Sequence, residues 1–184
     1  MSSKLNIIGI LAGHYGTLSG INKKTLPADK LCFFGIPLFI AFLGVAFQLS
    51  LKESQISLLV NFGAIFTALL LSVLVLVYDQ ENKSRAIKSA LESSGKAVPP
   101  GYGVRIELLR ELYLNLSYSI LIALLLIAVC FLGSLIGDIK IYKPWGITLS
   151  VISFTPIALF LVTNLMLTIV MVVKRLHVLL TTEI

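Results

Sequence analysis

Four long stretches of the chain carry no Asp, Glu, Lys or Arg: residues 32–49, 56–78, 113–137 and 145–173. An α-helix needs about 20 apolar residues to cross a bilayer core of about 30 Å, and each stretch approaches or exceeds that length. The segment ALLLSVLVLVY at 68–78 is apolar on every side, whereas a soluble bundle helix keeps polar residues on its water-facing side. The pattern therefore predicts an all-α, polytopic membrane protein with four transmembrane helices.

Helical patterns on both sides of residues 96–103 predict a hairpin between the second and third spans. Residues 79–95 contain good helix formers and end at Gly95, a common helix stop. Residues 96–103 contain two prolines and two glycines, which favour a turn, and helical spacing resumes at Val104 without a breaker before the third span. We expect this stalk, residues 79–112, to project about 15–20 Å from the membrane. Its apolar stripe would pack on its own other arm or on a neighbouring subunit.

The remaining segments are too short for a separate soluble core. An N-terminal cytoplasmic segment, residues 1–31, precedes one transmembrane domain, residues 32–184, which ends in a cytoplasmic tail at 174–184. We predict a short interfacial helix in the N-terminal segment, with His14 as an anchor at the level of the lipid headgroups. The apolar tail would fold back on the stalk or bind a partner. Pro156 predicts a kink in the fourth span.

The distribution of basic residues predicts the orientation. Of the 15 Lys and Arg residues, four precede the first span, six lie in the stalk and two in the tail, whereas three lie in the opposite turns. The positive-inside rule then locates both termini and the stalk in the cytoplasm, and we expect a bacterial inner-membrane protein. Basic residues beside the bilayer also attract anionic headgroups. The sequence has no basic run with interleaved aromatics and no zinc-finger spacing, so no direct nucleic-acid binding is expected.

Polar residues within the predicted spans are uncharged. Asn61 lies in the outer part of the second span, and Asn115 and Asn164 lie in the inner halves of the third and fourth. Such amides hydrogen-bond between helices for about 1 kcal/mol each, so they act as packing contacts or line a pore or ligand cleft. Gly133 and Gly137 form a GxxxG pattern, which permits close helix approach within the bundle or in a homo-oligomer. These five residues are the candidates for oligomer contacts or pore lining.

The sequence carries no recognisable catalytic motif. His14 and His177 are the two histidines, and there is no HExxH, nucleophile elbow, paired acidic motif or phosphate loop. Cys32 and Cys130 are predicted to lie at different depths of the bilayer and to be free. We therefore expect no enzyme activity, no metal site and no cofactor. The absence of ionisable residues from the spans also weakens the hypothesis of a small-solute transporter.

The arrangement as a whole resembles small bacterial four-helix membrane proteins of anti-phage defence loci, such as the membrane component of the two-gene Kiwa system. The features that carry the resemblance are HYGTL at 14–18, LLLSVLVLVYD at 69–79 and RELYLNLSYSILIALLLI at 110–127. The resemblance covers the whole chain as a pattern of hydropathy and topology, and it transfers no functional residue. It implies a homo-oligomeric membrane sensor or anchor whose cytoplasmic stalks hold a soluble effector.

The leading hypothesis is a non-enzymatic, oligomeric scaffold or sensor that binds a cytosolic protein through the stalk and tail. The candidate contacts with this partner are Arg85, Lys88, Leu91, Arg105, Leu108 and Arg110. The alternative is a regulated pore-forming or membrane-disrupting effector, in which Asn, Thr and Ser side chains surround an axis and gating occurs by dewetting. A small-solute transporter is the third hypothesis.

Overall fold

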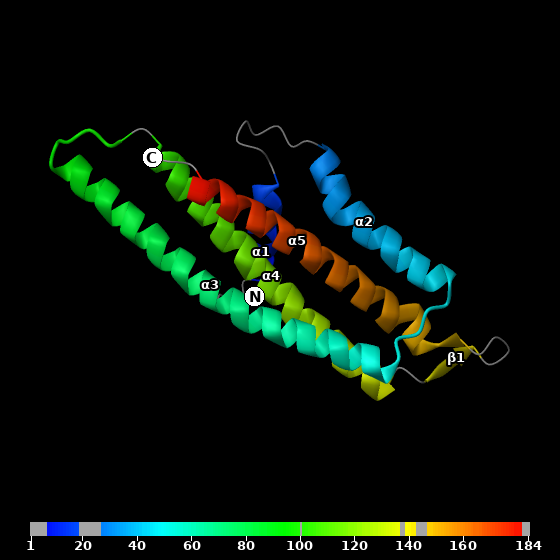
Figure 1. Ribbon diagram of the computed structural model, residues 1–184. Helices are drawn as coiled ribbons and strands as arrows, with labels where there is room; N and C mark the ends of the chain where they lie inside the picture. Colours follow the sequence, from blue (N-terminus) through cyan, green and yellow to red (C-terminus); the bar gives the residue numbers. More distant parts are fainter. Residues whose placement is uncertain (1–6, 19–26, 100, 137–138, 143–146, 182–184) are drawn as a thin grey trace.

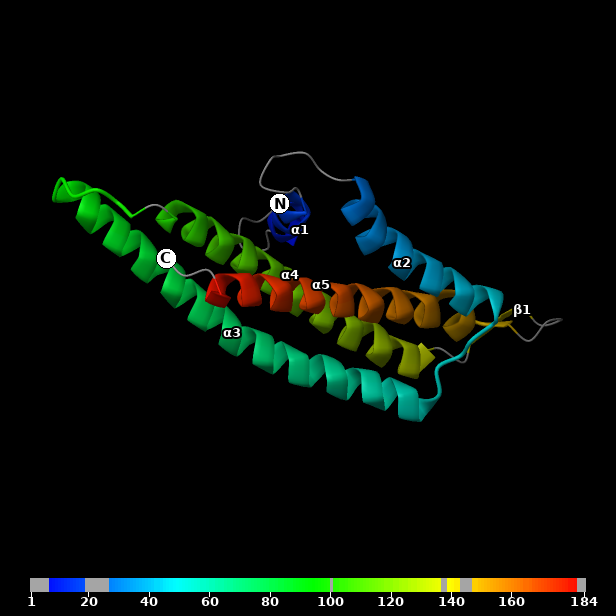
Figure 2. The same cartoon turned by 45° about the horizontal axis from the view of Figure 1, so that its top comes forward.

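The computed structural model describes residues 7–18, 27–99, 101–136, 139–142 and 147–181, and this part of the chain is almost entirely helical. Its helices are α1 (Ile7–Thr17), α2 (Pro27–Ala46), α3 (Glu53–Ser93), α4 (Tyr102–Ile136) and α5 (Thr155–Thr181). Between α4 and α5 lie β1 (Lys140–Tyr142), β2 (Ile147–Thr148) and a π-helical turn, η2 (Ser150–Phe154). The two short strands pair antiparallel. Figures 1 and 2 show the long helices side by side, with β1 at one end and the α3–α4 turn at the other.

Within the described residues, three helical segments are long and apolar enough to span a membrane: Glu53–Ser93, Tyr102–Ile136 and Ser150–Leu179. They correspond to the predicted second, third and fourth spans. The apolar part of α2, Leu31–Ala46, falls in a shorter class of helix and measures about 24 Å. The first span at 32–49 therefore stays a prediction.

The fourth predicted span begins later than expected. Helix was predicted from residue 145, but β2 occupies Ile147–Thr148 and the helical path starts with η2 at Ser150. Pro156, the second residue of α5, lacks the N–H that an α-helix would bond to the preceding turn. The wider π turn directly before Pro156 accommodates this loss, so the proline marks a change of helix type.

Helices α3 and α4 pack against each other as an antiparallel pair that extends past the end of α5 in both views (Figures 1 and 2). They contain 41 and 35 residues, about 60 and 50 Å, which exceeds the bilayer core of about 30 Å. Gly95 ends α3 with a φ of +68°. Its N–H donates to the Glu92 carbonyl at 3.2 Å and that of Lys96 donates to the Leu91 carbonyl at 3.1 Å, as in a Schellman motif. We call residues 79–112 of this pair the hairpin.

Buried side chains of the described residues form two clusters along α4. One surrounds Ala123, Leu126 and Leu165, where α4 meets α5. The other contains Leu109 and Leu112 of α4, which pack with Leu70 and Val77 of α3 and with Val172 of α5. The apolar residues of the α4 arm of the hairpin are thus covered by the part of α3 before residue 79 and by α5, so packing of one arm on the other stays a prediction. α5 does not fold back: it continues as a helix, and its last turns pack on the second cluster.

Candidate functional site: a buried polar cluster that holds helix α1

A group of buried polar side chains joins α1 to α4 and α5. His14 and Thr17 come from α1, Asn115 and Tyr118 from α4, and Asn164 from α5, and each is at most 6% exposed. Residues three apart lie on the same face of a helix, so the pair from α1 and the pair from α4 can meet as two surfaces. We call these five side chains the polar cluster.

Asn115 is the hydrogen-bonding centre of the polar cluster. Its Oδ1 lies 2.8 Å from His14 Nδ1 and accepts from the Thr17 hydroxyl at 2.9 Å. Because an amide oxygen only accepts, His14 Nδ1 carries the proton in this arrangement. The imidazole also stacks on the Tyr118 ring, with centroids 3.8 Å apart and an angle of 1° between the planes. Hydrogen bonds and a ring contact therefore hold α1 against α4.

The polar cluster continues to α2 through Asn164. The Tyr118 hydroxyl donates to Asn164 Oδ1 at 2.7 Å, and Asn164 Nδ2 donates to the backbone carbonyl of Phe33 at 3.1 Å. In a regular helix the Phe33 carbonyl would accept from the N–H of residue 37, but that residue is Pro37, which has none. Asn164 supplies the missing donor, as neighbouring helices do for proline-interrupted membrane helices.

A charged pair lies beside the polar cluster and caps α1. Arg175 Nη2 donates to the backbone carbonyl of Thr17 at 2.7 Å and lies 3.3 Å from Glu111 Oε2. Thr17 is the last residue of α1, where carbonyls lack partners inside the helix and the helix dipole is negative. A cation at this position therefore stabilises α1 and ties its end to α4 and α5.

Burial lowers the pKa of His14 from 6.5 to about 4; the hydrogen bond to Asn115 opposes this shift, and the charge of Arg175 adds to it. The ring is therefore neutral near pH 7. Among the described residues, His14 Nε2 and Asn115 Nδ2 have no hydrogen-bond partner. The contacts that the cluster does make run between helices, and they fix the position of α1.

The five oligomer or pore-lining candidates lie in different environments. Asn115 and Asn164 belong to the polar cluster and bond within one chain. Asn61 is exposed on α3. Gly133 faces η2, where an added Cβ would lie 3.2 Å from Phe154 Cβ. Gly137 lies outside the described residues.

The six candidate partner contacts lie on the hairpin, away from the polar cluster. Arg85 and Arg110 are exposed, whereas Lys88, Leu91, Arg105 and Leu108 are half-buried. Arg85 Nη2 pairs with Glu81 Oε1 at 2.6 Å, and Lys88 Nζ lies 3.8 Å from Glu92 Oε1. The Nε of Arg105 is buried and has no hydrogen-bond partner in the described part of the chain. The six residues are thus spread over both arms, and Arg85 and Arg110 are the two whose side chains are exposed.

Sequence reasoning named Asn115 and Asn164 as packing contacts or pore lining, but it missed Thr17 and Tyr118 and gave His14 a different place. His14 was expected at the headgroup boundary, and this was wrong because the side chain is 1% exposed and packed between helices. The interfacial helix in turn packs on α4, where Gly13 lies so close to Leu114 that an added Cβ would come within 2.9 Å of Cδ2. A His and a Thr three residues apart in a short apolar helix were the available signal. Arg175 was counted only as a cytoplasmic charge, because nothing in its local sequence indicates a pairing with Glu111.

No family model, curated protein or solved structure matches the chain. In the described residues, no group of three or more His, Cys, Asp and Glu side chains could hold a metal ion. The interpretation of the site therefore rests on its own contacts.

Proposed function

We propose that this protein is a non-enzymatic, oligomeric scaffold or sensor in a bacterial inner membrane, and that its hairpin binds a cytosolic protein. The observation that carries the proposal is the length of α3, which continues to Ser93 beyond the end of its apolar run at Tyr78. This extension has 15 residues, about 22 Å, and begins with Asp79. Its ionisable residues are costly in a hydrocarbon core, so the extension belongs outside it.

The α4 arm of the hairpin is well suited to binding because its packing against α3 and α5 keeps it rigid. Leu109 and Leu112 are 1% and 0% exposed, and burial of a leucine side chain contributes about 1.5–3 kcal/mol. On the outer surface, Lys83 pairs with Asp79 at 2.7 Å, an exposed contact worth less than about 1 kcal/mol. A surface formed before binding avoids most of the entropy cost of ordering it.

Two exposed apolar side chains on the hairpin favour a protein partner. Ile87 is 48% exposed and Val104 is 57% exposed, and both lie in the charged part of the chain. Exposed apolar residues beside charges such as Arg85 and Arg110 are typical of protein interaction surfaces. Both residues lie outside the predicted spans, so contact with lipid explains their exposure less well than it explains the exposed apolar faces of the spans.

The sensor role draws support from the polar cluster. It ties α1 to Asn115 and Tyr118 of α4, and the N-terminal part of that helix forms one arm of the hairpin. A displacement of α1 would therefore act on the helix that carries the binding surface. The excess of basic residues supports a cytoplasmic hairpin and cytoplasmic termini. The resemblance to four-helix proteins of anti-phage defence supports a role beside a soluble effector.

Homo-oligomerisation is supported by Asn61. The side chain is exposed on an apolar helix and has no hydrogen-bond partner among the described residues. An asparagine amide both donates and accepts, so it can pair with the same residue of a second copy. The pore alternative is less favoured, because the amides of Asn115 and Asn164 bond inside one chain.

Replacing residues 84–103 with a short Gly-Ser linker tests the proposal. We expect the variant to stay in the membrane fraction but to lose its co-purifying soluble protein. A finer variant, Ile87→Asp with Val104→Asp, should reduce capture at least tenfold, whereas Ser93→Asp on an already polar, exposed position should not. Unchanged capture by the linker variant would reject the hairpin as the binding site.

A further inference from the structure

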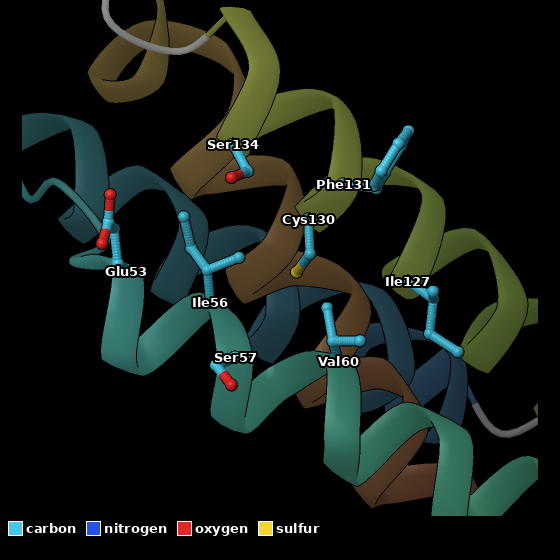
Figure 3. A pocket seen from close by; sticks show the side chains of 8 residues that line it. All are labelled: Glu53, Ile56, Ser57, Val60, Ile127, Cys130, Phe131 and Ser134. Atoms are coloured by element: carbon cyan, nitrogen blue, oxygen red, sulfur yellow. The ribbon is translucent and has the colours of Figure 1, made fainter.

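A cleft opens between α3 and α4 at the end of the pair opposite the hairpin turn (Figure 3). Its volume is about 410 Å³, within the range of about 300–1,000 Å³ found for small-molecule sites. The residues that line it are Glu53, Ile56, Ser57, Val60, Ile127, Cys130, Phe131 and Ser134. None of these residues belongs to the polar cluster or the hairpin.

Gly63 explains where the cleft closes. A Cβ at this position would lie 2.8 Å from Ile127 Cγ1 and 3.4 Å from the Ala123 carbonyl oxygen, so α3 and α4 approach closely there. One turn earlier in α3 the residue facing α4 is Val60, and the residue before that is Ile56, both of which are larger. The cleft lies between the two helices, on the side of Gly63 that leads towards the start of α3.

The side chains divide the cleft into an apolar interior and a polar mouth. Figure 3 shows Val60 and Ile127 at one end, with the Cys130 sulfur turned in beside Ile56. Glu53 and Ser134 lie at the other end, and Ser57 lies along the α3 wall. No salt bridge within the described residues involves Glu53.

We propose that this cleft binds an amphiphile with an ammonium head and a hydrocarbon chain. The chain would lie along Val60 and Ile127, and the ammonium would donate to the carboxylate of Glu53 and to the hydroxyl oxygen of Ser134, which lie at the same end of the cleft (Figure 3). Glu53 is the first residue of α3 and directly precedes the apolar run, so the head would lie at headgroup level. The ligand is a membrane lipid with an ammonium headgroup or a free amphipathic amine, which share this chemistry.

Photolabelling of the full-length protein in nanodiscs of phosphatidylglycerol tests the proposal. The probe is a dodecylamine with a diazirine in its chain, and the comparison probe is the corresponding dodecanol. We expect adducts of the amine on residues 56–60 and 127–131, at least fivefold more than those of the alcohol. Glu53→Gln should reduce these adducts at least fivefold, whereas Glu107→Gln, the same change on the exposed hairpin, should leave them unchanged.

A second variant keeps the test decisive if Glu53→Gln lowers the melting temperature. Val60→Phe fills the interior and leaves Glu53 in place, so the adducts on 127–131 should fall. Nanodiscs that contain phosphatidylethanolamine separate the two sources: competition assigns the site to the lipid headgroup, and full labelling assigns it to a free amine. Equal labelling by the amine and the alcohol, or adducts spread evenly over the outer faces of α2 and α5, would overturn the proposal.

Discussion

Asn115→Ala is the substitution that tests most directly how α1 is held. It removes the Oδ1 that faces His14 Nδ1 at 2.8 Å and Thr17 Oγ1 at 2.9 Å. The Thr17 hydroxyl keeps an acceptor, since the backbone carbonyl of His14 lies 2.7 Å away. The His14 N–H, in contrast, loses its partner while the ring is 1% exposed.

The expected cost follows from this difference between the two donors. A buried donor left without an acceptor costs about 1–3 kcal/mol, whereas the Thr17 hydroxyl loses little. The stacking of His14 on Tyr118, worth about 0.5–1.5 kcal/mol, and the cap from Arg175 remain. The equilibrium for undocking α1 should therefore rise about 5- to 150-fold, since each 1.4 kcal/mol is a factor of ten.

Hydrogen exchange measured by mass spectrometry on peptides covering α1 reports this equilibrium. Exchange of α1 amides should accelerate by the same factor in Asn115→Ala, while peptides from the buried half of α4 stay protected. Ser117→Ala is the matched control, because the Ser117 hydroxyl donates only within its own helix, to the Tyr113 carbonyl at 2.9 Å. Unchanged exchange of α1 in Asn115→Ala, or equal acceleration in the control, would refute the role given to Asn115.

Three further predictions follow from the same contacts. Burial lowers the pKa of His14 from 6.5 to about 4, so its contribution to folding stability is complete above about pH 6.5 and is lost as the pH falls towards 4. An NMR titration of the His14 ring checks this, and a midpoint near pH 6.5 would contradict its burial. Asn164→Leu leaves two buried groups unpaired, the Phe33 carbonyl and the Tyr118 hydroxyl, at about 1–3 kcal/mol each. Pro37→Ala should remove the part of this cost that comes from Phe33 by restoring an N–H, and additive melting shifts in the double variant would contradict this pairing. Gly95→Ala should lower hairpin stability by about 1 kcal/mol because of its φ of +68°, and an unchanged denaturation midpoint would show that the turn tolerates a side chain.

The long helices were predictable because their signals are local. The continuous apolar run ending at Tyr78, the helix formers after it and the stop at Gly95 all lie within α3 or next to it. The predicted helix from 104 to 137 likewise matches α4 closely, since no breaker separates its charged and apolar parts. The start of the fourth span was misplaced because the β-branched residues Ile147 and Thr148 suit a strand as well as a helix.

The polar cluster was not predictable because its contacts join distant residues. Thr17 and Asn115 are 98 residues apart, and Arg175 and Thr17 are 158 residues apart. Asn164 was recognised as a residue suited to bonding between helices, but its partner could not be chosen from sequence. A proline inside an apolar helix predicts that one backbone carbonyl, here that of Phe33, lacks its hydrogen-bond donor within the helix. It does not indicate which other helix supplies that donor.

The central claim is that the hairpin attaches a soluble protein to a membrane-embedded oligomer. Purification of the tagged protein from native membranes in a mild detergent, followed by mass determination of the intact complex, tests it most directly. The predicted result is a defined oligomer that carries a stoichiometric soluble protein, which the Ile87→Asp and Val104→Asp double variant lacks. A monomer without a partner, or a complex whose soluble protein stays bound to the double variant, would contradict the account.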